Sequence, residues 1–169
     1  GIQQSFRSLV MAPVGQNFRP AFAVTRGDFA KAMVLGGRVP QYLPQQSRYS
    51  DVRDRATMLF VESVQAGPNG ALFPSVNGST FQPNANVDRL SAVVALVRAA
   101  GLQQQAETGT HTLTYTDTLS IPSSLRGYVD VAIQSGLTRP HGTAFNPQGS
   151  FTRLDLARAM ARLSTMPLQ

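Results

Sequence analysis

Three arginines occupy matching places in the sequence, and a guanidinium group offers a specific binding chemistry. Arg26, Arg89 and Arg153 each lie eight positions after the phenylalanine of a Phe-x-Pro tripeptide, namely Phe18, Phe81 and Phe145. A guanidinium group presents a planar fork of N–H donors that holds a carboxylate or a pyruvyl group by paired hydrogen bonds. The alternative is an internal ion pair with Asp51, Asp117 or a carboxylate of a neighbouring segment. The spacing leaves both interpretations open.

A helix is expected to begin at each of these arginines. Thr25, Asp88 and Thr152 come directly before them, and their side-chain oxygens can accept hydrogen bonds from the free amides of a first helical turn. Apolar residues recur at the third, sixth and seventh positions after each arginine, as one buried helix face requires. They are Phe29, Ala32 and Met33, then Ala92, Ala95 and Leu96, then Leu156, Ala159 and Met160. The pattern predicts three capped helices with a closely packed alanine in each.

A second shared element precedes two of these segments. Tyr49 and Asp51 are matched by Tyr115 and Asp117 in an aromatic-x-Asp pattern. Each pair leads into a helical stretch that ends at glycine, 56–67 and 125–136. The aspartates either cap the turn into that helix, pair with an arginine, or accept hydrogen bonds from sugar hydroxyls. Tyr49, Tyr115 and Tyr128 are candidates for stacking on a sugar if their rings are exposed.

These patterns predict a mainly α-helical protein built from helix-loop-helix repeats. One repeat is an extended start, a helix, a loop with Phe-x-Pro, and a second, capped helix. The repeats cover residues 1–40, where the start is missing or degenerate, 49–103 and 115–165, and together they form one compact unit. We expect the phenylalanines of the Phe-x-Pro tripeptides to anchor the core, because one stands at the same place in every repeat.

The repeated segments resemble the S-layer homology domains of bacterial cell-surface proteins. The family pattern joins an aromatic-x-Asp-Val start, a Phe-x-Pro loop and an Ile-Thr-Arg-Ala-Glu segment. It is matched by Tyr49–Val52, Phe18–Asp28, Phe81–Ser91 and Phe145–Asp155. The resemblance implies a pseudo-threefold, three-lobed helical bundle in which the second helices are central. It also implies clefts between the lobes that bind a cell-wall polysaccharide, often one that bears pyruvate.

The resemblance further implies which residues bind the polysaccharide. They come from the Thr-Arg pair of the family pattern: Thr25, Arg26, Arg89, Thr152 and Arg153. The side chains of the aromatic-x-Asp start complete the candidate polysaccharide site: Tyr49, Asp51, Tyr115 and Asp117. In the middle repeat Asp88 replaces the threonine. The chain also differs from the family in two ways. Asp28, Ser91 and Asp155 stand where the family has glutamate, and the family's tryptophan is absent, because this chain has none.

Composition excludes several classes of chemistry. The 169 residues include no cysteine, so disulfides, thiolate metal sites and cysteine nucleophiles are ruled out. His111 and His141 have no acidic residue at metal-ligand spacing, and we expect them at the surface. No motif for a nucleophilic serine, a zinc-dependent hydrolase or a phosphate-binding loop is present. The sequence therefore predicts a protein that is not an enzyme and that needs no cofactor and no metal.

Charge and hydropathy bear on the partners. Fifteen basic and nine acidic residues give a net charge of +6, which favours an acidic partner. The basic residues are scattered and form no stripe interleaved with aromatic residues, so nucleic acid is not expected. No stretch approaches the roughly 20 apolar residues of a membrane-spanning helix. Because the chain begins at Gly1 rather than at methionine, we expect further domains of a parent protein upstream.

Two hypotheses of function follow. The first is a non-catalytic anchoring module, extracellular and associated with the cell envelope or the S-layer, that binds an anionic cell-wall polysaccharide, a pyruvylated one included. The alternative is a degenerate accessory domain of the same family that packs against its parent secreted or surface enzyme. Binding that weakens as salt is added would distinguish the first hypothesis from binding of a neutral glycan.

Overall fold

The computed structural model describes residues 21–73, 79–140 and 142–167. This part of the chain is mainly helical, as expected, and holds no strand beyond isolated bridges between extended residues. The helices are α2 (Arg26–Leu35), α3 (Arg55–Gln65), α4 (Arg89–Ala99), α5 (Gln103–Glu107), α6 (Arg126–Gln134) and α7 (Arg153–Leu163), with short 3-10 turns η1 (Thr118–Ser120) and η2 (Ser123–Leu125). Phe18 and His141, which the sequence analysis singled out, lie outside the described residues.

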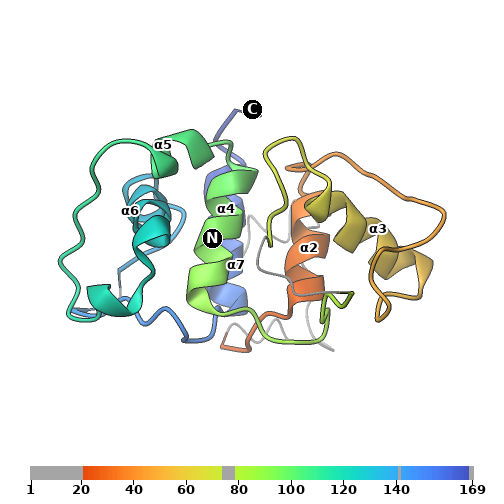
Figure 1. Ribbon diagram of the computed structural model, residues 1–169, viewed down its shortest axis with the longest axis horizontal. Coiled ribbons are helices and arrows are strands. Elements are labelled where there is room, and N and C mark those ends of the chain that lie inside the picture. The colour runs from red at the N-terminus through yellow and green to blue at the C-terminus, as the bar shows by residue number, and fades with distance from the viewer. Residues whose placement is uncertain (1–20, 74–78, 141, 168–169) are drawn as a thin grey trace.

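The helices that begin at the three arginines, α2, α4 and α7, lie at the centre of the molecule, with α3 and α6 on opposite sides (Figure 1). Helix α3 packs on α2, and α6 packs on α4 and α5. The first helix of each expected repeat therefore packs more extensively on the second helix of the preceding repeat than on its own partner. The loop that carries Phe-x-Pro is long enough to let the chain cross to its neighbour in this way.

The three segments that precede the central helices are joined in a closed ring. The amide of Val24 donates to the carbonyl of Phe151 (2.9 Å), that of Phe151 to Val87 (3.1 Å), and that of Val87 to Val24 (2.9 Å). These residues hold the same position in their segments, two before each arginine. All three are buried. Because a buried amide or carbonyl needs a partner, each segment completes the hydrogen bonding of the other two.

The predicted helix caps are confirmed. Thr25 accepts a hydrogen bond from the amide of Asp28 and caps α2. Asp88 does the same for α4 through the amide of Ser91 (2.6 Å). Thr152 caps α7, where the cap closes in both directions as a capping box. Caps of this kind stabilise a helix by about 1 kcal/mol each, and here they also set the direction in which each central helix leaves the ring.

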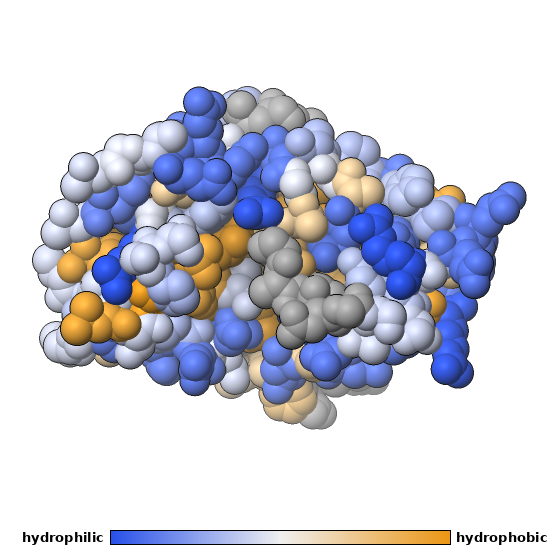
Figure 2. Space-filling view, in the orientation of Figure 1, coloured by the Kyte–Doolittle hydropathy of each residue, from blue (hydrophilic) through white to orange (hydrophobic). Residues whose placement is uncertain are grey.

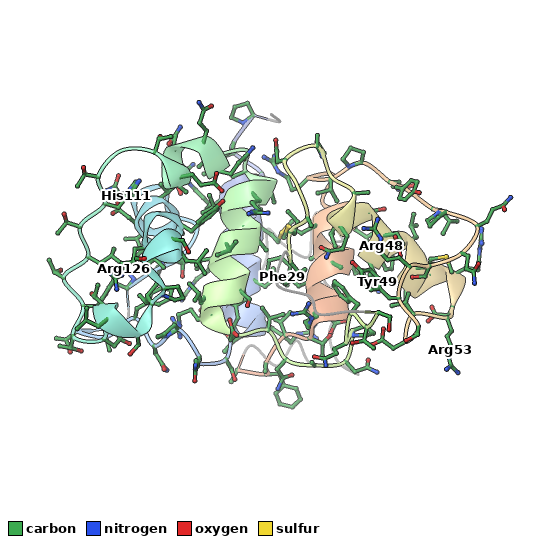
Figure 3. The ribbon with its side chains drawn as sticks, viewed as in Figure 1. Phe29, Arg48, Tyr49, Arg53, His111 and Arg126 are labelled. Carbon is green, nitrogen blue, oxygen red and sulfur yellow. The ribbon has the colours of Figure 1, made fainter. Side chains whose placement is uncertain are left out.

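The core contains the apolar residues expected of the central helices. The three alanines of the repeated pattern, Ala32, Ala95 and Ala159, are 0–1% exposed, which allows the close packing that was predicted. The phenylalanines of the second and third Phe-x-Pro tripeptides, Phe81 and Phe145, are each 1% exposed and are confirmed as core anchors. Figure 3 shows Phe29 between α2 and α4, and its ring meets those of Phe73 and Phe151.

Helix α5 was not anticipated, because the second repeat was expected to end at residue 103, where this helix begins. This helix packs on α6, and Gly127 of α6 faces the carbonyl of Ala106 in α5. A Cβ atom at Gly127 would lie 1.8 Å from the carbonyl oxygen of Ala106. Only glycine fits at this contact, so the α5–α6 pairing depends on it.

We therefore expect Gly127→Ala to destabilise the protein. Alanine favours a helix over glycine by about 1 kcal/mol, but the clash with a backbone oxygen outweighs that gain and leaves a net loss of at least about 2 kcal/mol. Gly67→Ala is the matched control, since a Cβ there meets its nearest neighbours at 3.8 Å. Thermal unfolding of both variants would check this. Equal melting temperatures for the two variants would contradict it.

His111 also fastens α5 to α6, so its expected place at the surface was wrong. Its Nδ1 lies 2.7 Å from the carboxylate of Asp130, and its Nε2 faces the carbonyls of Gln105 (3.0 Å) and Thr108 (2.9 Å). The side chain is 17% exposed. Because the carboxylate of Asp130 and these carbonyls all favour the protonated ring, the pKa of His111 is raised above its usual value.

The raised pKa predicts how stability varies with pH. A histidine that binds its proton more tightly when folded stabilises the protein most below its unfolded pKa of about 6.5. That contribution is lost as pH rises through the higher folded pKa. Urea unfolding between about pH 6 and pH 8 should therefore show falling stability. His111→Gln should remove most of this slope and His141→Gln should retain it. An unchanged slope in His111→Gln would contradict the assignment.

Candidate functional site

Asp51 and Asp117 hold the Phe-x-Pro loops, which corrects the expectation that they cap a helix or pair with an arginine. Asp51 accepts from the amides of Phe81 (2.9 Å) and Gln82 (2.8 Å). Asp117 accepts in the same way from Phe145 (3.0 Å) and the next residue (2.8 Å). The aromatic-x-Asp start and the Phe-x-Pro loop of a repeat are thus one structural unit, clamped by a carboxylate.

The clamp has both a conformational and an electrostatic consequence. Gln82 and Asn146, the middle residues of the two tripeptides, have φ angles of 61° and 59°, which non-glycine residues seldom adopt. Their amides are held in place by the aspartates. The amide of Phe145, assisted by that of Asn146, in turn holds the pKa of Asp117 below its usual range. The cap of α3 comes instead from Asp54, which accepts from the amide of Thr57.

Arg26 lies at a seam, where the start of α2 meets the second Phe-x-Pro loop. Its Nε donates to the carbonyl of Phe81 (2.8 Å), and its guanidinium carbon lies 4.7 Å and 4.8 Å from the ring centres of Phe73 and Phe81. Burial lowers the pKa of Arg26. The internal carboxylate pair weighed from the sequence does not form with any described residue. A carbonyl and two aromatic faces take its place.

Arg89, like Arg26, lies near the ring of a Phe-x-Pro phenylalanine, but it has fewer partners. It is 7% exposed, and its guanidinium carbon lies 5.9 Å from the ring centre of Phe145. Its Nε has no hydrogen-bond partner within the described part of the chain. Arg153 is half-buried at the start of α7, and its amide donates to the carbonyl of Phe22 (2.8 Å). The three arginines therefore stand at seams, each at the junction of its helix with the loop of another segment.

The free amides at the starts of the central helices are also taken up by the protein. They donate to carbonyls of the loops in other segments: Arg26 to Ala85 (2.8 Å), Gly27 to Pro83 (2.8 Å), Arg89 to Gly149 (2.8 Å), Leu90 to Pro147 (3.0 Å) and Arg153 to Phe22 (2.8 Å). These amides are part of the scaffold.

The tyrosines do not supply the exposed rings that stacking on a sugar requires. Tyr49 is 6% exposed and packs on Phe81, with ring centres 5.6 Å apart. Tyr128 is 1% exposed, and its hydroxyl donates to the carboxylate of Glu107. Tyr115 is half-buried against Phe145 at 5.9 Å. Figure 3 shows Tyr49 turned inward, whereas Arg53 points away from the body of the molecule.

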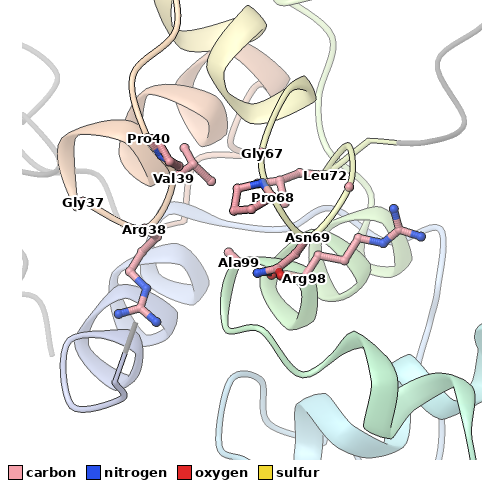
Figure 4. A pocket seen from close by; sticks show the side chains of 11 residues that line it. Gly37, Arg38, Val39, Pro40, Gly67, Pro68, Asn69, Leu72, Arg98 and Ala99 are labelled. Atoms are coloured by element: carbon pink, nitrogen blue, oxygen red, sulfur yellow. Dashed lines mark hydrogen bonds between the residues drawn. The ribbon is translucent and has the colours of Figure 1, made fainter. Parts of the chain in front are cut away.

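Three recesses of the described surface differ in their chemistry. The first, of about 200 Å³, lies between the turn after α2 and the loop after α3 (Figure 4). Both of its arginines already donate hydrogen bonds within the protein. Arg38 donates to the carbonyls of Leu163 and Met166 at the end of α7. Arg98 donates to the carbonyl of Ala71. In Figure 4 the Arg38 side chain points away from the recess towards α7.

The second recess, of about 460 Å³, lies between α4 and the turns η1 and η2. Its lining is largely apolar, with Leu72, Leu90, Val94 and Leu125 among its residues. Figure 2 shows that apolar surface gathers over this side of the molecule, the side that holds α6. This recess offers little charge to an acidic ligand.

The third recess, of about 440 Å³, lies between the turn after α6 and the side of α7, and it is lined by Arg139, Arg158 and Arg162. Sequence reasoning missed these arginines because they belong to no shared motif and because Arg139 lies far from the other two in the chain. The sequence held only a weak sign of this site, namely that Arg158 and Arg162 are one helical turn apart on α7. Arg139 joins them only through the fold.

Neither a metal site nor a membrane-spanning helix is found in the described ranges. No three histidine, aspartate or glutamate residues gather there in a way that could hold a metal ion. None of the helices observed combines the length and the apolar character needed to cross a membrane.

Comparison with known proteins finds similarity to a surface-layer protein. The chain is 23% identical over 169 residues to the surface-layer 125 kDa protein of Lysinibacillus sphaericus. The alignment covers 95% of this chain and 14% of that protein, so the chain spans about one seventh of its length. No protein-family model matches the chain. The chain is thus similar in sequence to a region of a surface-layer protein.

The seam geometry predicts that Arg26 contributes to stability. Arg26→Ala removes a half-buried hydrogen bond and two cation–π contacts, and we expect a loss of about 2 kcal/mol. Lys31→Ala is the matched control, because it removes one positive charge from an exposed position of the same helix. Urea unfolding of the two variants would measure the difference. A loss in Arg26→Ala no larger than in the control would show that the seam contact is not stabilising.

Proposed function

We propose that the chain is a non-catalytic module of the bacterial cell envelope that tethers its parent protein to an acidic cell-wall polysaccharide. Residues 1–40, 49–103 and 115–165 are then three repeats of one S-layer homology unit, arranged around the ring of hydrogen bonds as a three-lobed bundle. The ring is the observation that carries the proposal, because it makes one unit from three segments of the same pattern. The similarity to a surface-layer protein supports it.

The clamps between Asp51 or Asp117 and the Phe-x-Pro loops support the repeat assignment. The same carboxylate, in the same register, accepts from the same pair of amides in both copies. Two unrelated segments have no physical reason to share this arrangement. In this proposal Arg26 and Arg89 position the loops at the seams, and Thr25 and Thr152 cap their helices. Contact with the polymer remains a prediction for Arg153.

The net charge of +6 supports an acidic partner. A polymer with carboxylate or phosphate groups along its length meets such a surface at several points. Each contact is weak when exposed to solvent, so the proposed tether depends on several contacts made together.

Sedimentation of the protein with purified cell envelope tests the proposal. We expect the chain to bind native envelope and to lose binding when the acidic polysaccharide is extracted beforehand. Raising the ionic strength from about 0.05 M to about 0.5 M should weaken binding several-fold, because it screens exposed charge pairs.

Three outcomes would count against this function. Failure to bind native envelope would remove the tethering role. Binding that survives extraction of the acidic polymer would point to a neutral glycan. Association with the parent protein alone would favour the alternative, an accessory domain that packs on a secreted or surface enzyme.

A further inference from the structure

The recess beside α7 is defined by residues from two parts of the chain. The turn after α6 supplies 136–140, and α7 supplies Asp155, Arg158 and Arg162. With Arg139 from the turn, three guanidinium groups and one carboxylate line a volume of about 440 Å³. This size lies within the range of small-ligand sites. We call this recess the arginine cleft.

The positive charge of the arginine cleft is not neutralised by the described residues. No carboxylate among them forms an ion pair with Arg139, Arg158 or Arg162. The one acidic residue of the lining, Asp155, is occupied in the capping box of α7, where it accepts from the amide of Thr152 (3.0 Å). The cleft therefore holds a net positive charge with donors still available.

Arg162 is held in place before any ligand arrives. Its Nε donates to the carbonyl of Ser135 (2.7 Å), and one terminal nitrogen donates to Thr165 (2.7 Å). Gly136 makes this position available, because its φ of +79° suits glycine and a Cβ there would lie 3.3 Å from the Nε of Arg162. A fixed guanidinium loses less entropy on binding than a free one.

Arg139 and Arg158 are exposed and form no hydrogen bond with the described residues. Their donors are thus free to meet a ligand in the recess. The cleft combines one anchored guanidinium group with two that can move onto an anion.

The recess beside α7 differs in charge from the recess beside α4. Arg158 lies five residues after the first residue of its helix, where α4 has Val94 and α2 has Lys31. Val94 lines the largely apolar recess between α4 and the turns η1 and η2. Equivalent positions therefore give an apolar wall beside α4 and a cationic wall beside α7.

We propose that the arginine cleft binds an oxyanion carried by a sugar of the envelope polymer, either a carboxylate or a phosphate substituent. Guanidinium groups bind both through paired, charge-assisted hydrogen bonds. This inference rests on the proposed function and names the part of the surface that would recognise the acidic group.

The test uses two double variants of the full chain. Arg139→Gln with Arg158→Gln removes the two movable guanidinium groups of the cleft. Lys31→Gln with Arg53→Gln is the control, because it removes the same charge from exposed positions outside the cleft. Circular dichroism would check that both remain folded.

The probes are an oligogalacturonate, an oligo(glycerol phosphate) and a neutral oligosaccharide, with binding measured by calorimetry. We expect the cleft variant to bind at least one acidic probe about tenfold more weakly than the native chain. The control should stay within about twofold, and the neutral probe should not bind to the cleft. The probe that is affected identifies the carboxylate or the phosphate as the recognised group.

Failure of this inference can be distinguished from failure of the proposed function. If both double variants bind the acidic probe equally weakly, the effect comes from overall charge, and the proposed role of the arginine cleft is wrong. If the cleft variant binds envelope as strongly as the native chain does, the proposed role of the arginine cleft is wrong, and the tethering function stands. An acidic probe that binds through the cleft in a chain that does not bind envelope would support the cleft and overturn the tether.

Discussion

The pairing of buried backbone groups across three distant segments is the constraint on which the rest of this structure depends. Val24, Val87 and Phe151 exchange amide and carbonyl bonds in a closed ring, and each is buried. An unpaired buried amide or carbonyl costs free energy comparable to a lost hydrogen bond. No single segment can satisfy these backbone groups alone. The three segments must therefore come together before any of the central helices has a fixed position.

This constraint explains the positions of the motif residues. The first amides of α2, α4 and α7 donate to loops of other segments, and Arg26 continues that contact with the carbonyl and ring of Phe81. Helix starts and their arginines are thus part of the joints between the three segments. Charge that is free to meet a ligand lies elsewhere, on the side of α7 and on the turn that follows α6.

Much of the fold could be predicted because its signals are local. A capping side chain acts on amides three residues away, and a helix face repeats every three or four positions, so Thr25 and Thr152 marked their helices correctly. Asp51 was misread because its partners, Phe81 and Gln82, lie some thirty residues away. His111 was misread for the same kind of reason, since it lies in a loop and its partner Asp130 lies in α6.

The sequence by itself determined the helical class, the caps and the buried phenylalanines, because these follow from short-range hydrogen bonding and from the periodicity of apolar residues. Tertiary structure alone decided which helices pack together, which loops the aspartates clamp, and that Arg139 joins Arg158 and Arg162 around one recess. Such contacts join residues far apart in the chain, and no spacing rule encodes the distance between two side chains that only the folded backbone brings together.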